Sequence, residues 1–204
     1  MSQQNYVFRE TGGRPDAPVI FTFHGTGGNE TQFHNLASEL VAGARVISPR
    51  GDVSENGAAR FFKRTGEGVY DMPDLENRTQ AMADFIQAHV SRWPKTPVIG
   101  LGYSNGANIL ASVVFHHPKL FQKVILLHPL VTWTPKPAPD LASVDVLMTA
   151  GLNDPICPPQ QTRALEAYFS AQGTSVSTHW HEGGHEIARS ELAAMARFLD
   201  GQGG

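Results

Sequence analysis

The sequence has little cysteine, no long apolar run and no block of like charges. Its one cysteine, Cys157, excludes an internal disulfide and is typical of chains kept in the reducing cytoplasm, where we expect this protein to act. No apolar run approaches the roughly 20 residues of a membrane span, and the first six residues lack the basic and apolar regions of a signal peptide. The formal net charge of −3 is spread along the chain, which argues against nucleic-acid binding.

Apolar runs that suit strands alternate with patterns that suit helices. Strands are predicted at residues 6–8, 19–23, 45–48, 98–101, 124–127, 144–149 and 176–180, and helices at residues 31–41, 75–93, 105–116, 160–171 and 186–199. We expect Asp74 to cap the helix over residues 75–93. This alternation is typical of an α/β fold with a mostly parallel sheet and helices on both faces. The length suits a single domain over residues 1–204.

A serine flanked by glycines stands between a predicted strand and a predicted helix. Residues 102–106 read Gly-Tyr-Ser-Asn-Gly, the G-x-S-x-G pattern of a nucleophile elbow. In such a turn Ser104 has a strained backbone, and side chains at Gly102 or Gly106 would collide with the flanking strand and helix. The helix N-terminus behind the serine offers backbone N–H groups to an oxyanion. An ordinary strand-to-helix turn with an inert serine is the alternative for this pattern taken alone.

An acid and a histidine follow the serine, each just after a predicted strand. Asp154 follows the strand over residues 144–149, and His185 follows the strand over residues 176–180. The order Ser, Asp, His is that of α/β-hydrolases. Because the carboxyl ends of parallel strands meet at one edge of a sheet, the three loops can converge there. We therefore predict a catalytic triad with Ser104 as nucleophile, His185 as general base and Asp154 as the acid that orients it.

The strand over residues 19–23 runs into His-Gly-Thr-Gly-Gly at residues 24–28. This segment fits the His-Gly-x-Gly loop that supplies the second donor of an oxyanion hole. We predict that the donors are the backbone N–H groups of Thr26 and Asn105. Residues 24–28 taken alone would also fit a plain glycine turn.

Two connections, over residues 49–73 and 128–139, break the alternation. Long connections inside a domain are usually functional or disordered, and their aromatic residues argue against disorder. Both leave strands toward the predicted catalytic edge, so we expect them to wall a substrate pocket lined by Phe61, Phe62, Met72 and Trp133. The alternative, in which these side chains only anchor the loops to the body of the protein, stays open.

Motifs spread over nearly the whole chain resemble those of one group of esterases. They lie at residues 24–28, 48–51, 56–57, 60–62, 102–108, 151–156 and 184–185. The chain resembles the small bacterial carboxylesterases of the phospholipase/carboxylesterase (dienelactone-hydrolase-like) branch of the α/β-hydrolase superfamily, most of all the esterases associated with hydroquinone stress. The resemblance implies an α/β-hydrolase fold without a cap domain, and ester hydrolysis through an acyl-enzyme. Dienelactone hydrolases proper have a cysteine where this chain has Ser104.

Other functions remain open from the sequence. A thioesterase or a lysophospholipase-type hydrolase would use the same three residues, and the fold also occurs in non-catalytic binding proteins. His179, His181 and His185 lie close enough in sequence for a zinc site, but no matching acidic ligand set accompanies them. We therefore predict no metal and no organic cofactor. The expected partner is a small-molecule ester, and a homodimer is left open.

Overall fold

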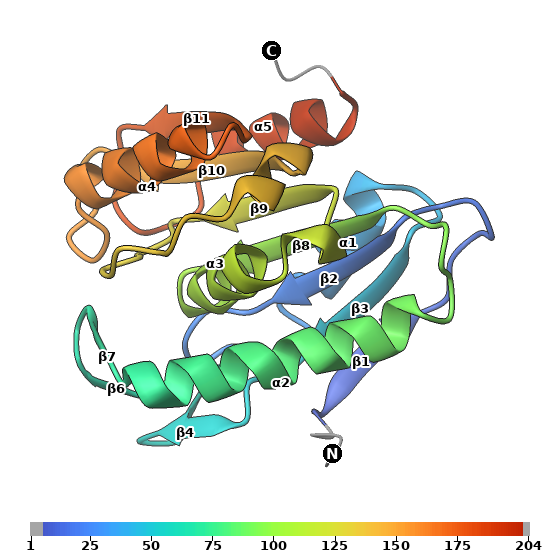
Figure 1. Ribbon diagram of the computed structural model, residues 1–204, viewed down its shortest axis with the longest axis horizontal. Coiled ribbons are helices and arrows are strands. Elements are labelled where there is room, and N and C mark those ends of the chain that lie inside the picture. Colours follow the sequence, from blue (N-terminus) through green and yellow to red (C-terminus); the bar gives the residue numbers. More distant parts are fainter. Residues whose placement is uncertain (1–5, 202–204) are drawn as a thin grey trace.

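A seven-stranded β-sheet forms the centre of the computed structural model, which describes residues 6–201. The strand order is β1-β3-β2-β8-β9-β10-β11 (Figure 1). Only β1 runs antiparallel to its neighbour in this sheet. The strands are β1 (Phe8–Thr11), β2 (Val19–Phe23), β3 (Arg45–Pro49), β8 (Val98–Tyr103), β9 (Lys123–Leu127), β10 (Asp145–Gly151) and β11 (Ser175–His181). The predicted α/β fold with a mostly parallel sheet is confirmed.

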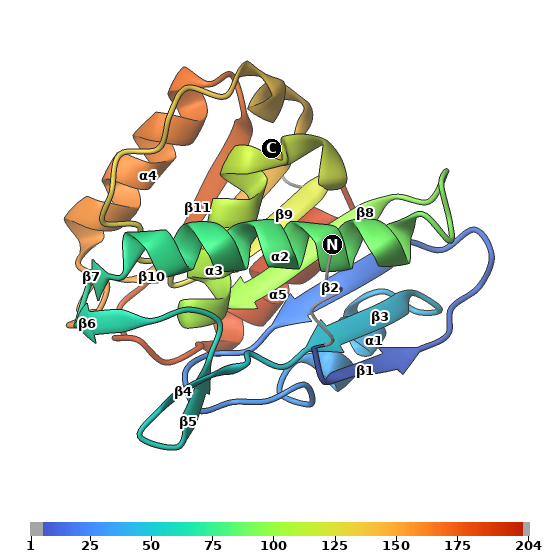
Figure 2. The ribbon, with the colours of Figure 1, turned by 60° about the horizontal axis from the view of Figure 1, so that its bottom comes forward.

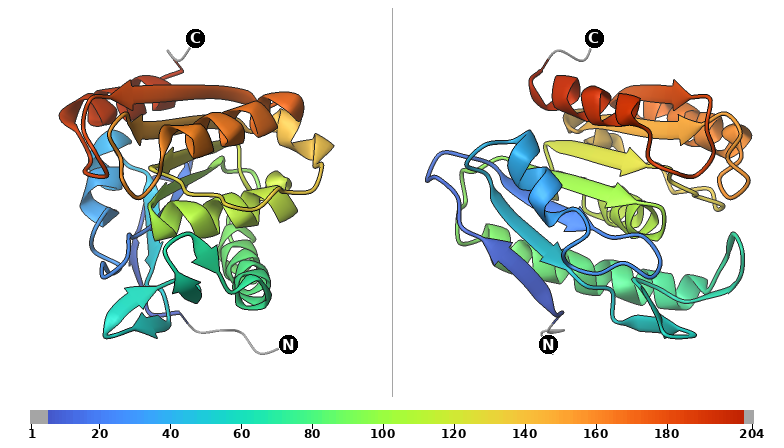
Figure 3. Two further views of the ribbon diagram at one scale, coloured as in Figure 1. Left: turned by 90° about the vertical axis from the view of Figure 1, so that its left-hand side faces the viewer. Right: turned by 180° about the vertical axis from the view of Figure 1, so that it is seen from behind.

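Helices cover both faces of the sheet. On one face lie α2 (Met72–Val90), α3 (Asn105–His116) and α4 (Pro159–Ala171), and on the other lie α1 (His34–Leu40) and α5 (Arg189–Leu199) (Figure 3). Two short 3-10 helices, η1 (Pro118–Leu120) and η2 (Pro139–Ser143), lie in connections. A parallel sheet covered on both faces needs continuous apolar strands, and all five residues of β2 are buried. This explains why the central strands appear in the sequence as apolar runs.

The helix that follows Ser104 is almost wholly enclosed. Eleven of the 12 residues of α3 are buried, because α3 packs against β8 and β9 of the sheet and against α2. In contrast, α2 buries one stripe that runs from Leu75 through Thr79 and Met82 to Ile86, the spacing of one helix face. Among residues 6–201 no helix is both long and apolar enough to cross a membrane.

The start of α2 differs from the prediction. The helix begins at Met72 rather than at residue 75, and its N-cap is Asp71 rather than Asp74. The Asp71 carboxylate accepts a hydrogen bond from the Asp74 N–H at 3.1 Å, which satisfies one of the free donors of the first turn. Pro73 suits this turn because it has no N–H group to satisfy. The expected role of Asp74 was therefore wrong by one helical turn.

Other elements are shifted or shortened at their ends. The edge strand β1 covers residues 8–11 instead of 6–8, and Tyr6 packs edge-on against Phe85 with ring centroids 5.4 Å apart. Helix α1 begins three residues later than expected, at His34, and α5 begins at Arg189 rather than at residue 186. The late start of α5 leaves His185 and the residues after it in a loop.

The connection over residues 49–73 contains two β-hairpins. The first pairs β4 (Val53–Glu55) with β5 (Ala58–Arg60), and the second pairs β6 (Arg64–Gly66) with β7 (Val69–Tyr70). Asn56 and Gly57 turn the first hairpin with φ angles of 51° and 87°, the left-handed pair that a tight two-residue hairpin favours. Both hairpins lie beside the carboxyl ends of the central strands (Figure 2). Within residues 6–201 no inserted cap domain is present.

Candidate active site

Ser104 occupies a sharp turn between β8 and α3. Its backbone has φ 52° and ψ −118°, a strained conformation for a residue with a side chain. The chain is closely packed on either side of it. A Cβ on Gly102 would lie 2.6 Å from the carbonyl oxygen of Gly106, and a Cβ on Gly106 would overlap the carbonyl oxygen of Phe23. Side chains are therefore excluded at both positions, which is the reason that the sequence indicated for these glycines.

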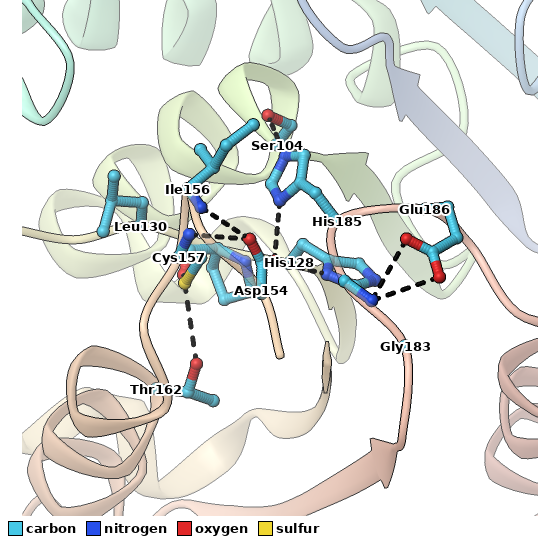
Figure 4. A network of polar contacts seen from close by, with 12 residues as sticks. Ser104, His128, Leu130, Asp154, Ile156, Cys157, Thr162, Gly183, His185 and Glu186 are labelled. Carbon is cyan, nitrogen blue, oxygen red and sulfur yellow. Dashed lines mark hydrogen bonds and ion pairs between the residues drawn. The ribbon is translucent and has the colours of Figure 1, made fainter. Parts of the chain in front are cut away.

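The structure brings Ser104, His185 and Asp154 into one hydrogen-bonded chain. The Ser104 Oγ lies 2.8 Å from the Nε2 of His185, and the Nδ1 of His185 lies 2.7 Å from the Oδ2 of Asp154 (Figure 4). An ionised carboxylate only accepts hydrogen bonds, so the Nδ1 carries the proton and the Nε2 accepts from the serine hydroxyl. This arrangement can remove the hydroxyl proton as the serine oxygen attacks a carbonyl carbon.

Asp154 is held as a carboxylate by four donors. Its Oδ1 accepts from the backbone N–H groups of Ile156 at 2.8 Å and Cys157 at 2.9 Å. Its Oδ2 accepts from His185 and, at 3.0 Å, from the Nδ1 of His128. Burial alone would raise the pKa of Asp154, but the hydrogen bonds from Cys157, His128 and His185 hold the pKa below its usual value. The side chain is therefore anionic near neutral pH.

Backbone contacts join the loops that carry the acid and the base. The Asn153 N–H donates to the carbonyl oxygen of Gly183 at 3.0 Å. Gly151 lies so close to Gly184 that an added Cβ would overlap the carbonyl oxygen of Gly184. The separation of the two loops is thus fixed by main-chain packing, and position 151 admits only glycine.

Two backbone N–H groups beside Ser104, those of Thr26 and Asn105, are available to donate to a bound group. Thr26 and Asn105 line the same cavity as Ser104, and within residues 6–201 neither N–H donates to a protein acceptor. The first hairpin and the residue after it hold both side chains. Arg60 donates to the Oγ1 of Thr26 at 2.8 Å, and the N–H of Phe61 donates to the Oδ1 of Asn105 at 2.8 Å.

His24 fixes the loop over residues 24–28 from behind. Its Nδ1 donates to the carbonyl oxygen of Gly25 at 2.7 Å, and its Nε2 accepts from the N–H of Gly51 at 2.9 Å. Burial lowers the pKa of His24, so the ring is neutral and has one donor and one acceptor for these two partners. The histidine of this motif therefore ties two loops together and does not line the cavity beside Ser104.

A cavity of about 240 Å³ opens at Ser104, and we call it the serine cavity. Its size is below that of most pockets for drug-sized ligands. Polar and charged side chains make up most of its wall, with few aliphatic ones. Besides Ser104, His185 and the two N–H donors, the wall includes Arg60, Arg64, Glu67, Tyr70, Asn108, Leu130 and Ile156. The sequence had not marked the two arginines or Tyr70 as pocket residues, because the hairpins that present them lack a periodic pattern.

Phe61 and Phe62, which the sequence placed in the substrate pocket, do not line the serine cavity. Their exposed fractions are 1% and 0%. Phe61 packs against Phe23 with ring centroids 5.7 Å apart, and Phe62 packs edge-on against Tyr70 at 5.0 Å. Both rings anchor the hairpin segment to the core, which is the alternative that the sequence left open.

Met72 and Trp133 lie at a different cavity. This second cavity has a volume of about 620 Å³ and shares no lining residue with the serine cavity. Trp133 packs edge-on against Tyr70, which lines the serine cavity, with ring centroids 5.9 Å apart. Neither Met72 nor Trp133 lines the serine cavity itself.

The histidine cluster differs from the one that the sequence indicated. His179 contacts Ser190 through its Nε2 at 3.0 Å and belongs to no group with metal-ligand spacing among residues 6–201. Instead, His128, His181 and Glu191 lie together behind Asp154. On the sequence alone, neither His128 nor Glu191 was given a role. The one available signal was the position of His128 directly after a predicted strand, at the catalytic edge.

The fold and this site define an α/β-hydrolase, and comparisons with known proteins identify the branch. The family described as "Serine aminopeptidase, S33" matches residues 14–144. The Bacillus subtilis protein named "Putative hydrolase MhqD" is 41% identical over 181 residues, which cover 88% of this chain and 90% of that protein. The chain belongs to the α/β-hydrolase family and, within it, to the carboxylesterase/phospholipase branch.

Solved structures agree over the whole chain. The Agrobacterium tumefaciens protein Atu2452, of unknown function, is 51% identical with a TM-score of 0.93 and full coverage of both chains (100%). A carboxylesterase from Bacillus cereus is 33% identical with a TM-score of 0.91, covering 98% of this chain and 96% of that one. A carboxylesterase from Mesorhizobium loti is 27% identical with a TM-score of 0.86, covering 96% and 95%. The fold of the described residues is therefore that of known carboxylesterases.

Proposed function

We propose that this protein is a serine carboxylesterase that hydrolyses esters through an acyl-enzyme on Ser104. The observation that carries the proposal is the hydrogen-bonded chain from Ser104 through His185 to Asp154, beside two free backbone donors. The names of the Bacillus cereus and Mesorhizobium loti carboxylesterases support the same reaction class.

The reaction proceeds in two acyl-transfer steps. In the first, His185 takes the proton of Ser104 while the serine oxygen attacks the ester carbonyl, and the N–H groups of Thr26 and Asn105 bind the resulting oxyanion. His185 then gives its proton to the leaving alcohol. In the second step His185 takes a proton from water as the water attacks the acyl-enzyme, and returns it to the Ser104 oxygen as the acid is released. Asp154 orients His185 and stabilises its charged form throughout, and no metal or organic cofactor takes part.

The serine cavity favours short acyl groups. A volume of about 240 Å³ leaves little room for a long alkyl chain. Among p-nitrophenyl esters we expect kcat/KM to be highest for acetate and butyrate and to fall for octanoate and longer chains. Thioesters of the same acids belong in the panel, because the same three residues would cleave them. A maximum at long chains would contradict this assignment of the acyl site.

Covalent labelling tests the nucleophile directly. A fluorophosphonate should add once to the protein, as seen by intact-mass spectrometry, and the adduct should be absent in Ser104→Ala. Ser112→Ala is the matched control, since Ser112 is a buried serine of α3, the helix that follows Ser104, and contacts Thr79 instead of His185. Labelling that persists in Ser104→Ala would overturn the assignment.

A further inference from the structure

The acid of the proposed triad is shared by two imidazoles. Asp154 Oδ2 accepts from the Nδ1 of His185 at 2.7 Å and from the Nδ1 of His128 at 3.0 Å. Figure 4 shows the two rings on different sides of Asp154, with centroids 5.2 Å apart. A catalytic triad needs only one histidine beside its acid. His185 fills that role, so the triad does not explain the presence of His128.

His128 lies between two carboxylates. Its exposed fraction is 0%, and its Nε2 lies 3.1 Å from the Oε1 of Glu191, which is also fully buried. Ionised carboxylates have no proton to donate, so both contacts are hydrogen bonds only when both nitrogens of His128 carry protons. Burial alone would lower the pKa of His128, but hydrogen bonds to Glu191 and Asp154 outweigh it and raise the pKa.

The conformation of His128 and the position of Glu191 maintain this arrangement. His128 follows β9 with a φ of 49°, a left-handed conformation that is strained in a residue with a side chain. Its N–H donates to the carbonyl oxygen of Thr149 at 3.0 Å. Glu191 lies in the first turn of α5 and accepts from the N–H of Ala188, where the positive end of the helix dipole favours a carboxylate.

Two further titratable groups, His181 and Tyr103, have rings close to His128. His181, on β11, accepts from the N–H of Gly183 with its Nδ1 at 3.0 Å, so its neutral form places the proton on Nε2, 3.4 Å from Glu191. Tyr103, on β8, is 5.9 Å away by ring centroids, and burial raises its pKa. The cluster therefore holds Asp154 and Glu191 as anions with His128 between them.

We propose that His128 is a positioning residue whose buried positive charge, maintained by Glu191, offsets the charge of Asp154 and keeps His185 free to act as a base at lower pH. The proposal rests on the proposed esterase function. A positive charge within about 4–6 Å disfavours protonation of a neighbouring group by roughly 1–3 pH units, and the more distant charge of Glu191 opposes part of that effect. Without the charge of His128, the Asp154 carboxylate would favour the protonated form of His185. The enzyme would then gain activity only at higher pH.

Glu191→Gln removes the charge of the carboxylate and keeps the shape of the site. Glutamine has the same size, its amide N–H can donate to a neutral His128 Nε2, and its oxygen can still accept from Ala188. His128 then keeps its hydrogen bond to Asp154 and loses its charge. We expect the ascending limb of kcat/KM against pH to move up by about 1 unit, with the plateau above it kept within about tenfold. Glu186→Gln is the matched control, because Glu186 is exposed, contacts the N–H of Gly184 and does not touch His128. Because Glu186→Gln removes a negative charge, we expect the ascending limb of kcat/KM to move to slightly lower pH or to stay in place.

Nuclear magnetic resonance of 15N-histidine tests the charge without any assay of activity. In the unmodified protein we expect one ring, assigned by its absence in His128→Asn, to remain doubly protonated at about pH 8, where an unperturbed imidazole is neutral. The same ring should be singly protonated at that pH in Glu191→Gln. A neutral His128 in the unmodified protein, or an unshifted limb in a folded Glu191→Gln, would overturn the proposal. Absence of both esterase activity and fluorophosphonate labelling in the unmodified protein would instead refute the proposed function, and the proton count on His128 would still be decided.

Discussion

The Tyr103 hydroxyl donates a hydrogen bond to the backbone carbonyl of His185 at 2.7 Å. The two rings also lie 5.4 Å apart. The residue before the proposed nucleophile is thereby attached to the residue that would act as its base, across 82 positions of the chain. The spacing between serine and histidine thus depends on a contact that neither side chain of the pair makes.

Tyr103→Phe removes that contact and leaves the ring. Loss of one hydrogen bond costs about 0.5–1.5 kcal/mol, and a displaced base slows proton transfer, so we expect kcat to fall by up to about tenfold. The measurement is steady-state kinetics on p-nitrophenyl acetate. Tyr168→Phe is the control, because the Tyr168 hydroxyl donates to the carbonyl oxygen of Lys136 at the same 2.7 Å, outside the serine cavity. Equal losses in the two variants would show that Tyr103 has no particular part in placing His185.

Asp154→Asn should nearly abolish turnover. The amide holds His185 in the wrong tautomer for proton removal from Ser104, a change worth about 10⁴-fold in kcat in related triads. The exposed Asp145, at the start of β10, the strand that precedes Asp154, supplies the control. We expect Asp145→Asn to keep its esterase rate. If the two variants exchanged these results with both proteins folded, Asp154 would not be the acid.

Phe62→Ala should lower stability without changing substrate preference. The ring is fully buried, and Phe→Ala in a core costs about 3–5 kcal/mol. For a chain of this size the corresponding fall in Tm is of the order of 10 °C. Aryl and small acetyl esters should lose activity in the same proportion. Val69→Ala is the comparison within the hairpin segment, since Val69 is 57% exposed. A selective loss on aryl esters with an unchanged Tm would restore Phe62 as a specificity residue.

Activity should survive chelation. Each role in the proposed reaction is filled by a side chain or a backbone N–H, so exhaustive treatment with EDTA should leave kcat/KM unchanged. The measurement pairs the assay with metal analysis of the purified protein. Suppose instead that EDTA abolished activity, that zinc restored it, and that His181→Ala blocked the restoration. That result would favour a metal held by the histidines behind Asp154.

The central part of the fold was accessible from the sequence because its signals are local. The apolar runs of β2, β8, β9 and β10 and the glycines around Ser104 mark strands and a tight turn that no other local structure explains. Strand order along the chain then places residues 104, 154 and 185 at one edge. The apolar runs and the glycines each depend on residues within a few positions of one another.

The parts that the sequence did not reveal depend on distant contacts. The hairpins over residues 53–70 have strands of two or three residues, too short for an alternating pattern. The direction in which Phe61 and Phe62 point follows from the hairpins, so the sequence did not reveal that both rings are buried away from the serine cavity. The contact between His128 and Glu191 joins positions 63 apart and has no sequence signature, since an isolated histidine and a glutamate in a helix are both common.

The glycine contact between residues 151 and 184 makes the acid and base loops one mechanical unit. Because main chain touches main chain there, a movement of β10 relative to the rest of the sheet would carry Asp154 and His185 together and leave their separation unchanged. Thermal motion in this region would then vary the distance from His185 to Ser104 far more than the distance from His185 to Asp154. Natural relatives should follow the same rule. Substitutions should be tolerated between His185 and Ser104 and excluded where Gly151 contacts Gly184.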